Sequence, residues 1–158
     1  METTLVQIVQ WLHVLSGITW FGGYIFMTFA VWPVLLRRPV PEARSFFTDF
    51  TKPVGSLMMV SGTLVLLLGI LRGTVFGIIR STEVLFNTSY GLTWLAALVL
   101  TLILTVHGAV SSKNMEERIW EGDHLRPDAA RYLRNTNVLA LVLFAVVLAC
   151  MVLMRFGM

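Results

Sequence analysis

The stretch LVQIVQWLHVLSGITWFGGYIFMTFAVWPVLL, residues 5–36, decides the fold of this chain. It contains no charged residue, and it is longer than the roughly 20 residues that a helix needs to span a bilayer. We therefore predict a membrane-spanning helix that is tilted or that protrudes from the membrane. Pro33 lies near the end of this helix and is expected to kink it, and Arg37 and Arg38 end it.

The composition of the whole chain agrees with a membrane protein. Of its 158 residues, 56% are hydrophobic and only 13% are charged, which is about half the charged fraction of a typical soluble domain. The formal net charge of +3 indicates an orientation in a membrane rather than nucleic-acid binding. Cys150 is the only cysteine, which excludes an internal disulfide and a cysteine-rich metal cage.

The sequence predicts an all-α fold, namely an integral membrane four-helix bundle with short interfacial helices in its links. We expect a single transmembrane domain over residues 1–158, in contact with the lipid bilayer. Four apolar segments supply its spanning helices: residues 5–36, 54–71, 91–110 and 137–154.

The links between these segments carry their own signals. Residues 42–50 place three phenylalanines among charges, which predicts a short amphipathic helix on the membrane surface. Residues 111–114 (Ser-Ser-Lys-Asn) are expected to end the third helix, and residues 115–120 to form another interfacial turn. Pro127 with Asp128 is typical of a helix start, so the fourth helix is expected to begin before its apolar segment.

Arginine and lysine are distributed unevenly over the links. The links after the first and third segments hold nine of them: Arg37, Arg38, Arg44, Lys52, Lys113, Arg118, Arg126, Arg131 and Arg134. The opposite side holds three: Arg72, Arg80 and Arg155. Because basic residues are retained on the cytoplasmic side, we expect both termini outside the cytoplasm.

One face of the first helix carries the strongest candidate site. His13, Gly17 and Trp20 fall on this face, with Gln10 one turn before. The face offers a possible metal ligand, a small residue that leaves room and an aromatic ring that can pack on a bound group. An ionisable residue inside a membrane is a functional candidate by default, although an imidazole hydrogen-bonded to Gln10 or to another helix would serve structure alone.

Glycines in the second segment recur every seven residues, at Gly55, Gly62 and Gly69. They fall roughly on one helix face, and glycine is costly inside a helix. Something must therefore approach this face closely. A neighbouring helix is one interpretation, and a flat macrocycle is the other.

The two membrane histidines are predicted to lie at different depths. Measured from the midpoint of each segment, His13 and His107 lie about 20 Å apart along the membrane normal, at 1.5 Å per residue. Two axial ligands of one haem must meet at one iron, so this pair is not expected to share it. The sequence instead predicts two sites, or one site and one structural histidine.

Further ligands can be assigned to each depth. Met154 is the only other soft ligand level with His13, and Arg72 lies on the same side, where it can meet a carboxylate such as a haem propionate. Three methionines lie within a turn of the depth of His107: Met27, Met58 and Met59. A His–Met pair suits haem iron or copper, so the candidate metal ligands are His13, His107 and Met154.

Other chemistries lack their residues. No acidic residue lies inside the four apolar segments, which counts against a proton-coupled transporter of the carboxylate type. The chain has no glycine-rich phosphate loop, no zinc-ligand spacing and no nucleophile next to a base. Neutral groups and imidazoles remain, and they favour a bound redox cofactor or metal over hydrolysis.

The first segment resembles two families of small membrane proteins. His13, with Trp20-Phe21-Gly22-Gly23 beginning seven positions later, resembles the first helix of the HemJ-type protoporphyrinogen oxidases and that of the copper resistance D (CopD) membrane domain. The likeness to the HemJ type continues through short motifs over nearly the whole chain. These are Thr51-Lys52-Pro53 with Gly62, His107-Gly108, and Arg131-Tyr132-Leu133-Arg134 with Asn137.

The resemblance implies a four-helix protein that binds haem b, with His13 as the ligand. It also implies a prokaryotic-type inner (plasma) membrane. The family activity is the oxidation of protoporphyrinogen, but the family lysine early in the third helix is absent here, where the chain reads Trp94-Leu95-Ala96-Ala97. That absence counts against this activity, whereas haem binding does not depend on it.

The resulting expectation is a b-type haem protein with a redox role, either an electron carrier or a haem-dependent oxidoreductase. Six residues are expected to bind the cofactor: His13, Gly17, Trp20, Gly62, Gly69 and Arg72. Two alternatives stay open, namely copper binding or transport of the CopD type and a structural subunit of a membrane complex. A redox partner or a second copy of the chain is a possible partner, and nucleic acid is not expected.

Overall fold

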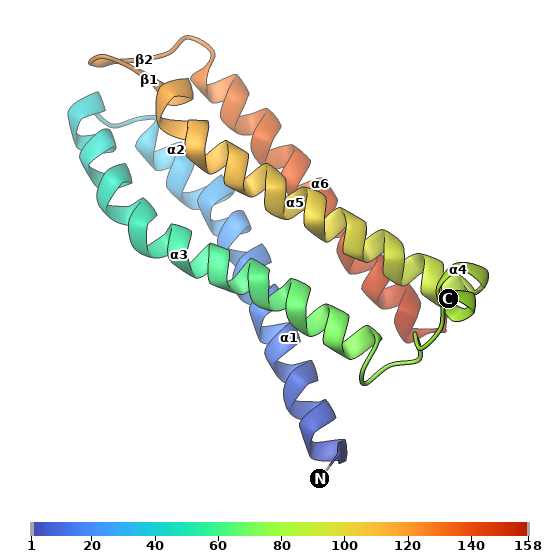
Figure 1. Cartoon of the computed structure of the whole chain (residues 1–158). Coiled ribbons are helices and arrows are strands. Elements are labelled where there is room, and N and C mark those ends of the chain that lie inside the picture. Colours follow the sequence, from blue (N-terminus) through green and yellow to red (C-terminus); the bar gives the residue numbers. More distant parts are fainter. Residues whose placement is uncertain (1, 158) are drawn as a thin grey trace.

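The computed structural model describes residues 2–157 and contains four long helices that are apolar enough to cross a membrane. This confirms the predicted all-α four-helix membrane bundle. Figure 1 shows the elements in chain order: α1 (Glu2–Phe26), the π-helix η1 (Met27–Val31), α2 (Trp32–Leu35), α3 (Val40–Gly73), α4 (Thr82–Asn87), α5 (Ser89–Ile119), β1 (Trp120–Glu121), β2 (His124–Leu125) and α6 (Ala129–Arg155).

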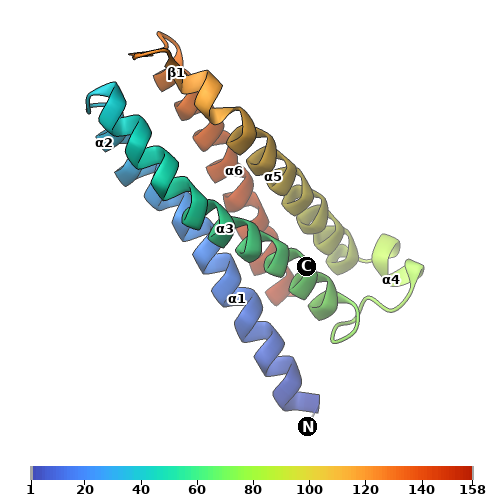
Figure 2. The ribbon, with the colours of Figure 1, turned by 60° about the vertical axis from the view of Figure 1, so that its left-hand side comes forward.

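The bundle consists of two helix pairs. α1 packs mainly on α3, and α5 packs mainly on α6, while the contacts between the pairs are fewer. The two views show each pair running side by side (Figures 1 and 2). We call the end with both termini and α4 the terminal end, and the end with α2 and the β1–β2 strands the hairpin end.

Two helices are longer than the sequence predicted. Residues 42–50 form no separate surface helix, because they are the first turns of α3, which continues through Pro53 to Gly73. Residues 111–114 do not end the third helix, and residues 115–120 are not a separate turn, because α5 continues to Ile119. α3 has 34 residues and is about 50 Å long, well beyond the bilayer core of about 30 Å.

Packing at the hairpin end explains this extra length. Ile119 is fully buried there, and Leu133 and Trp32 are nearly so. The buried cluster joins η1, four α-helices and a strand through nine residues: Val31, Trp32, Leu35, Ala43, Phe47, Ile119, Trp120, Ala129 and Leu133. Because this cluster buries one face of each polar link, the links continue the helices instead of lying flat on the membrane.

A widened turn lies directly before Pro33, where the sequence predicts a kink. In η1 the Trp32 backbone N–H donates to the carbonyl of Met27, five residues back. Proline cannot donate to its own i−4 carbonyl, and its ring crowds that carbonyl. The π-helix directly before Pro33 takes up this mismatch.

The connection from α5 to α6 is a small antiparallel hairpin. Trp120 pairs with Leu125 and Glu121 pairs with His124, and Gly122 has a positive φ of 58°. Glycine adopts this backbone conformation without strain, as a two-residue hairpin turn requires. As predicted, a helix starts after Pro127, with Asp128 as the residue that precedes α6.

A second core lies within the membrane-spanning part. It is formed by Trp20, Val65, Leu104, Ala140 and Phe144, one or two residues from each long helix. Trp20 contacts the Phe144 ring edge-on, with 4.9 Å between the ring centroids. The candidate site lies along α1 from this core toward the terminal end.

Candidate functional site

His13 packs against the backbone of α3 at Gly69. A Cβ added to Gly69 would lie 3.2 Å from Cε1 and 3.8 Å from Nδ1 of the imidazole, with no other ring atom within 4 Å. The ring is half-buried, and its Nδ1 is buried without a hydrogen-bond partner. Nδ1 therefore faces α3, and Nε2 lies farther from it.

Because Gly69 has no side chain, a backbone carbonyl of α3 is left accessible to the His13 ring. The carbonyl of Val65 lies one helical turn before Gly69, and no side chain at position 69 shields it. The Val65 backbone is within interaction range of the imidazole, although the Nδ1 geometry is not that of a hydrogen bond. The Nδ1 edge of His13 thus faces a backbone carbonyl. In many metal-bound histidines one ring nitrogen binds the metal and the other donates its hydrogen to such a carbonyl, which orients the ring.

Arg72 and Gln10 form a hydrogen-bonded polar pair near this histidine. Arg72 Nε donates to Gln10 Oε1 at 3.0 Å, and Arg72 Nη1 donates to the carbonyl of Phe76 at 3.0 Å. Gln10 is thus the partner of Arg72, and the sequence had offered it as a partner of His13. The guanidinium is held one helical turn from His13, at the terminal end.

Aromatic rings of α1 lie against two of the three glycines that recur every seven residues in α3. A Cβ at Gly62 would lie 3.0 Å from the indole of Trp20, and Gly69 receives His13 as described. A Cβ at Gly73 would overlap the indole of Trp94 from α5, whereas Gly55 has no neighbour within 4 Å. Residues of neighbouring helices therefore occupy the space beside Gly62 and Gly69, as in the neighbouring-helix interpretation.

These contacts decide where a macrocycle would fit. The face of α1 that meets α3 has no room for one, because Trp20 and His13 fill it, and Trp20 is only 6% exposed. Gly17, one turn after His13 on the same helix, differs. A Cβ there would meet nothing within 4 Å, although the residue is half-buried. Open space on this face of α1 therefore lies beside Gly17, and not between Trp20 or His13 and the glycines of α3.

His107 makes contacts far from those of His13. Its Nε2 lies 3.2 Å from the Thr136 carbonyl of α6, and a carbonyl can only accept, so Nε2 carries the proton. The next residue, Gly108, would place a Cβ 2.8 Å from the Tyr24 hydroxyl. His107 thus contacts α6, whereas His13 contacts α3.

The remaining candidate ligand is Met154. It lies half-buried in the last turn of α6, where its carbonyl accepts from Gly157. Within residues 2–157 no group of three or more His, Cys, Asp or Glu side chains is placed to hold a metal ion.

Two contacts at the terminal end were not expected from the sequence. The indole of Trp94 packs on Gly73. Gly91 lies against the backbone of α4, next to the carbonyls of Val84 and Leu85. Gly73 was visible as one more glycine a turn beyond Gly69, but nothing in the sequence indicated its partner.

Comparison with known proteins adds no relative. No protein-family model, no curated protein and no solved structure matches this chain.

Proposed function

We propose that this chain is a membrane haem b protein with a redox role, and that His13 binds the iron through Nε2. The observation that carries the proposal is the orientation of His13, whose Nδ1 is buried against the α3 backbone and whose Nε2 lies away from it. Haem supplies one-electron redox chemistry when bound.

The residues around His13 have separate roles in this proposal. Nδ1 is buried on the α3 side without a hydrogen-bond partner, and in this proposal the Val65 carbonyl would accept from it when iron binds Nε2 and so orient the ring. Gly17 leaves room for the macrocycle on the same side of α1. Arg72, already fixed by Gln10 and the Phe76 carbonyl, presents a guanidinium to a carboxylate.

The chain is oriented, in the same proposal, with its terminal end outside the cytoplasm of a prokaryotic-type inner membrane. Nine of the twelve basic residues belong to the links at the hairpin end, the side that the positive-inside rule assigns to the cytoplasm. The His13 site then lies toward the outer surface. Protoporphyrinogen oxidation is not part of the proposal, because the chain reads Trp94-Leu95-Ala96-Ala97, with no lysine, in the neighbourhood where the resembled family has one.

The visible absorption spectrum tests haem binding directly. Full-length protein purified after expression with ample haem is expected to show a Soret band, and the His13→Ala variant is expected to lose it, because the axial ligand is gone. The His124→Ala variant is the matched control, since His124 is exposed in the hairpin, and it should keep the band. The proposal would be contradicted by a colourless wild-type protein, or by a His13→Ala protein whose Soret band is unchanged. A colourless protein that binds Cu(I) would favour the copper alternative.

The position of the macrocycle can be tested through Gly17. A leucine at this position would fill the open space on the His13 side of α1, so the Gly17→Leu protein should retain at most about a tenth of the wild-type haem, a loss on the scale of one disrupted binding contact. Gly22→Leu is the control, because Gly22 also has no neighbour within 4 Å but is exposed. Equal haem content in the two variants would argue against a macrocycle beside Gly17.

A further inference from the structure

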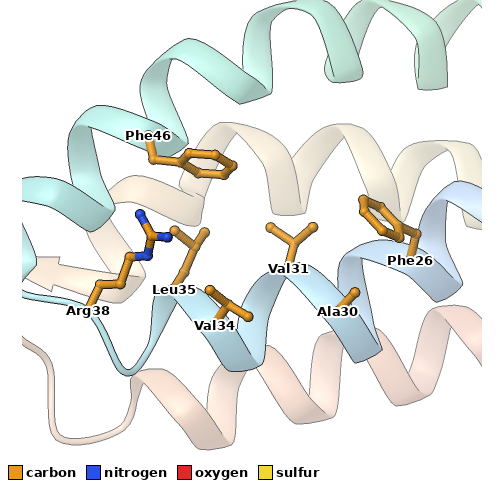
Figure 3. A pocket seen from close by; sticks show the side chains of 7 residues that line it. All are labelled: Phe26, Ala30, Val31, Val34, Leu35, Arg38 and Phe46. Atoms are coloured by element: carbon orange, nitrogen blue, oxygen red, sulfur yellow. The ribbon is translucent and has the colours of Figure 1, made fainter.

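A half-open apolar groove runs along the outside of α1 and α2 near the hairpin end, with α3 beside it. Its volume is about 280 Å³. Figure 3 shows Arg38 at one end and Phe26 at the other, with Phe46 reaching over from α3. The lining residues are Phe26, Ala30, Val31, Val34, Leu35, Arg38 and Phe46.

The local backbone gives the groove its shape. The π-helix η1 turns the chain more widely just where Ala30 and Val31 line the floor, and Ala30 has too small a side chain to fill it. Phe26 and Phe46 are both exposed and form raised walls. The groove therefore opens outward, toward the surroundings of the bundle, and not into its core.

The length of the groove matches one half of a bilayer. Nine residues separate Phe26 from Leu35, the last residue of α2, which is about 13 Å along a helix, and Arg38 lies in the turn that follows. The hydrocarbon of one leaflet is about 15 Å thick. The candidate span ends at Leu35 and Leu36 is the last apolar residue before Arg37 and Arg38, so Arg38 lies at the edge of the apolar region.

The charge at the end of the groove is not neutralised by the protein. Arg38 is exposed and takes part in none of the ion pairs found within residues 2–157. A guanidinium at the end of an apolar groove fits an occupant that is apolar along its length and anionic at one end. The apolar segments of a second copy of this chain could fill the groove but could not supply the anionic end. Residues 5–36, 54–71, 91–110 and 137–154 contain no acidic residue.

We propose that this groove binds a phospholipid with an anionic headgroup, with an acyl chain between Phe26 and Phe46 and the phosphate on Arg38. The site is independent of the haem proposal, since it lies at the other end of α1. Basic residues at the hairpin end attract anionic lipids in general. Arg38 differs from its basic neighbours because it lines the groove.

Native mass spectrometry of the full-length protein tests the proposal. Protein reconstituted in an equimolar mixture of phosphatidylglycerol and phosphatidylcholine is released into detergent, and the retained lipids are counted. The wild type should retain phosphatidylglycerol in preference to phosphatidylcholine. Arg38→Gln should lower that retention about tenfold by removing the charged contact, while Arg37→Gln, the adjacent exposed arginine outside the groove lining, should leave it unchanged.

A second pair of variants tests the apolar part of the groove. Ala30→Phe fills the floor and should abolish lipid retention, whereas Ala145→Phe, on the exposed face of α6, should not. Equal retention of both lipids, equal losses in the two arginine variants, or full retention in Ala30→Phe would each overturn the proposal. It would also fail if Ala30→Phe converted an oligomer to a monomer without changing the retained lipid, because the occupant would then be a second copy.

Discussion

The Trp20→Ala variant is expected to unfold far more easily than the wild type, even without any cofactor. Trp20 is 6% exposed, packs edge-on against Phe144 and lies against Gly62. Truncating a buried tryptophan leaves a cavity and typically costs about 3–5 kcal/mol. Lipid is as apolar as the protein core, so the loss here comes from packing rather than from transfer to water, and we expect about 3 kcal/mol.

Trp11→Ala is the matched control for this experiment. Trp11 lies on the same helix but is 67% exposed, so its removal should change the free energy of unfolding by less than about 0.5 kcal/mol. The measurement is unfolding in detergent micelles, followed by helical circular dichroism in haem-free protein. If the two variants lost equal stability, Trp20 would not be a packing residue of the bundle.

The Gly91→Ala variant is expected to lose about 2–3 kcal/mol, the upper range for overpacking. A Cβ at this position would overlap the carbonyls of Val84 and Leu85 and lie 2.7 Å from the Leu85 Cα. These are backbone atoms and cannot rotate away, so α4 must separate from α5. The hydrogen bond from the Gly91 N–H to the Thr88 hydroxyl holds the start of α5 where this overlap occurs.

Gly22→Ala separates this overlap from the general effect of replacing glycine. A Cβ at Gly22 would meet nothing within 4 Å, and alanine is favoured over glycine inside a helix by up to about 1 kcal/mol. This control should be as stable as the wild type or slightly more stable. Hydrogen exchange should show faster exchange of α4 (Thr82–Asn87) in Gly91→Ala alone, and unchanged α4 exchange would contradict the proposed contact.

The residues that stabilise the bundle are different from those proposed to bind the cofactor. The two buried clusters, one at mid-membrane and one at the hairpin end, hold the helix pairs together. The His13, Gln10 and Arg72 group lies outside both clusters, toward the terminal end. Substitutions at His13 can therefore change ligand binding with a smaller effect on folding than substitutions at Trp20.

The spanning helices could be predicted from sequence because their signal is local. A long uncharged run such as residues 5–36 must satisfy its backbone polar groups internally, and only a helix does so in lipid. The fourth helix start at Pro127-Asp128 was likewise a local signal. The ends of α3 and α5 were not, because residues 42–50 and 111–120 are helical through burial against each other and against α6.

By itself, the sequence determined that four helices cross a membrane, that an imidazole lies within the first of them and that glycines line one face of the second. Only the tertiary structure decided what meets those glycines: Trp20 and His13 of α1 lie against Gly62 and Gly69, and the open space is beside Gly17. The physical reason is that periodicity fixes which residues share a helix face, whereas the relative shift and rotation of two packed helices depend on side-chain fit. The orientation of the His13 ring follows from that fit.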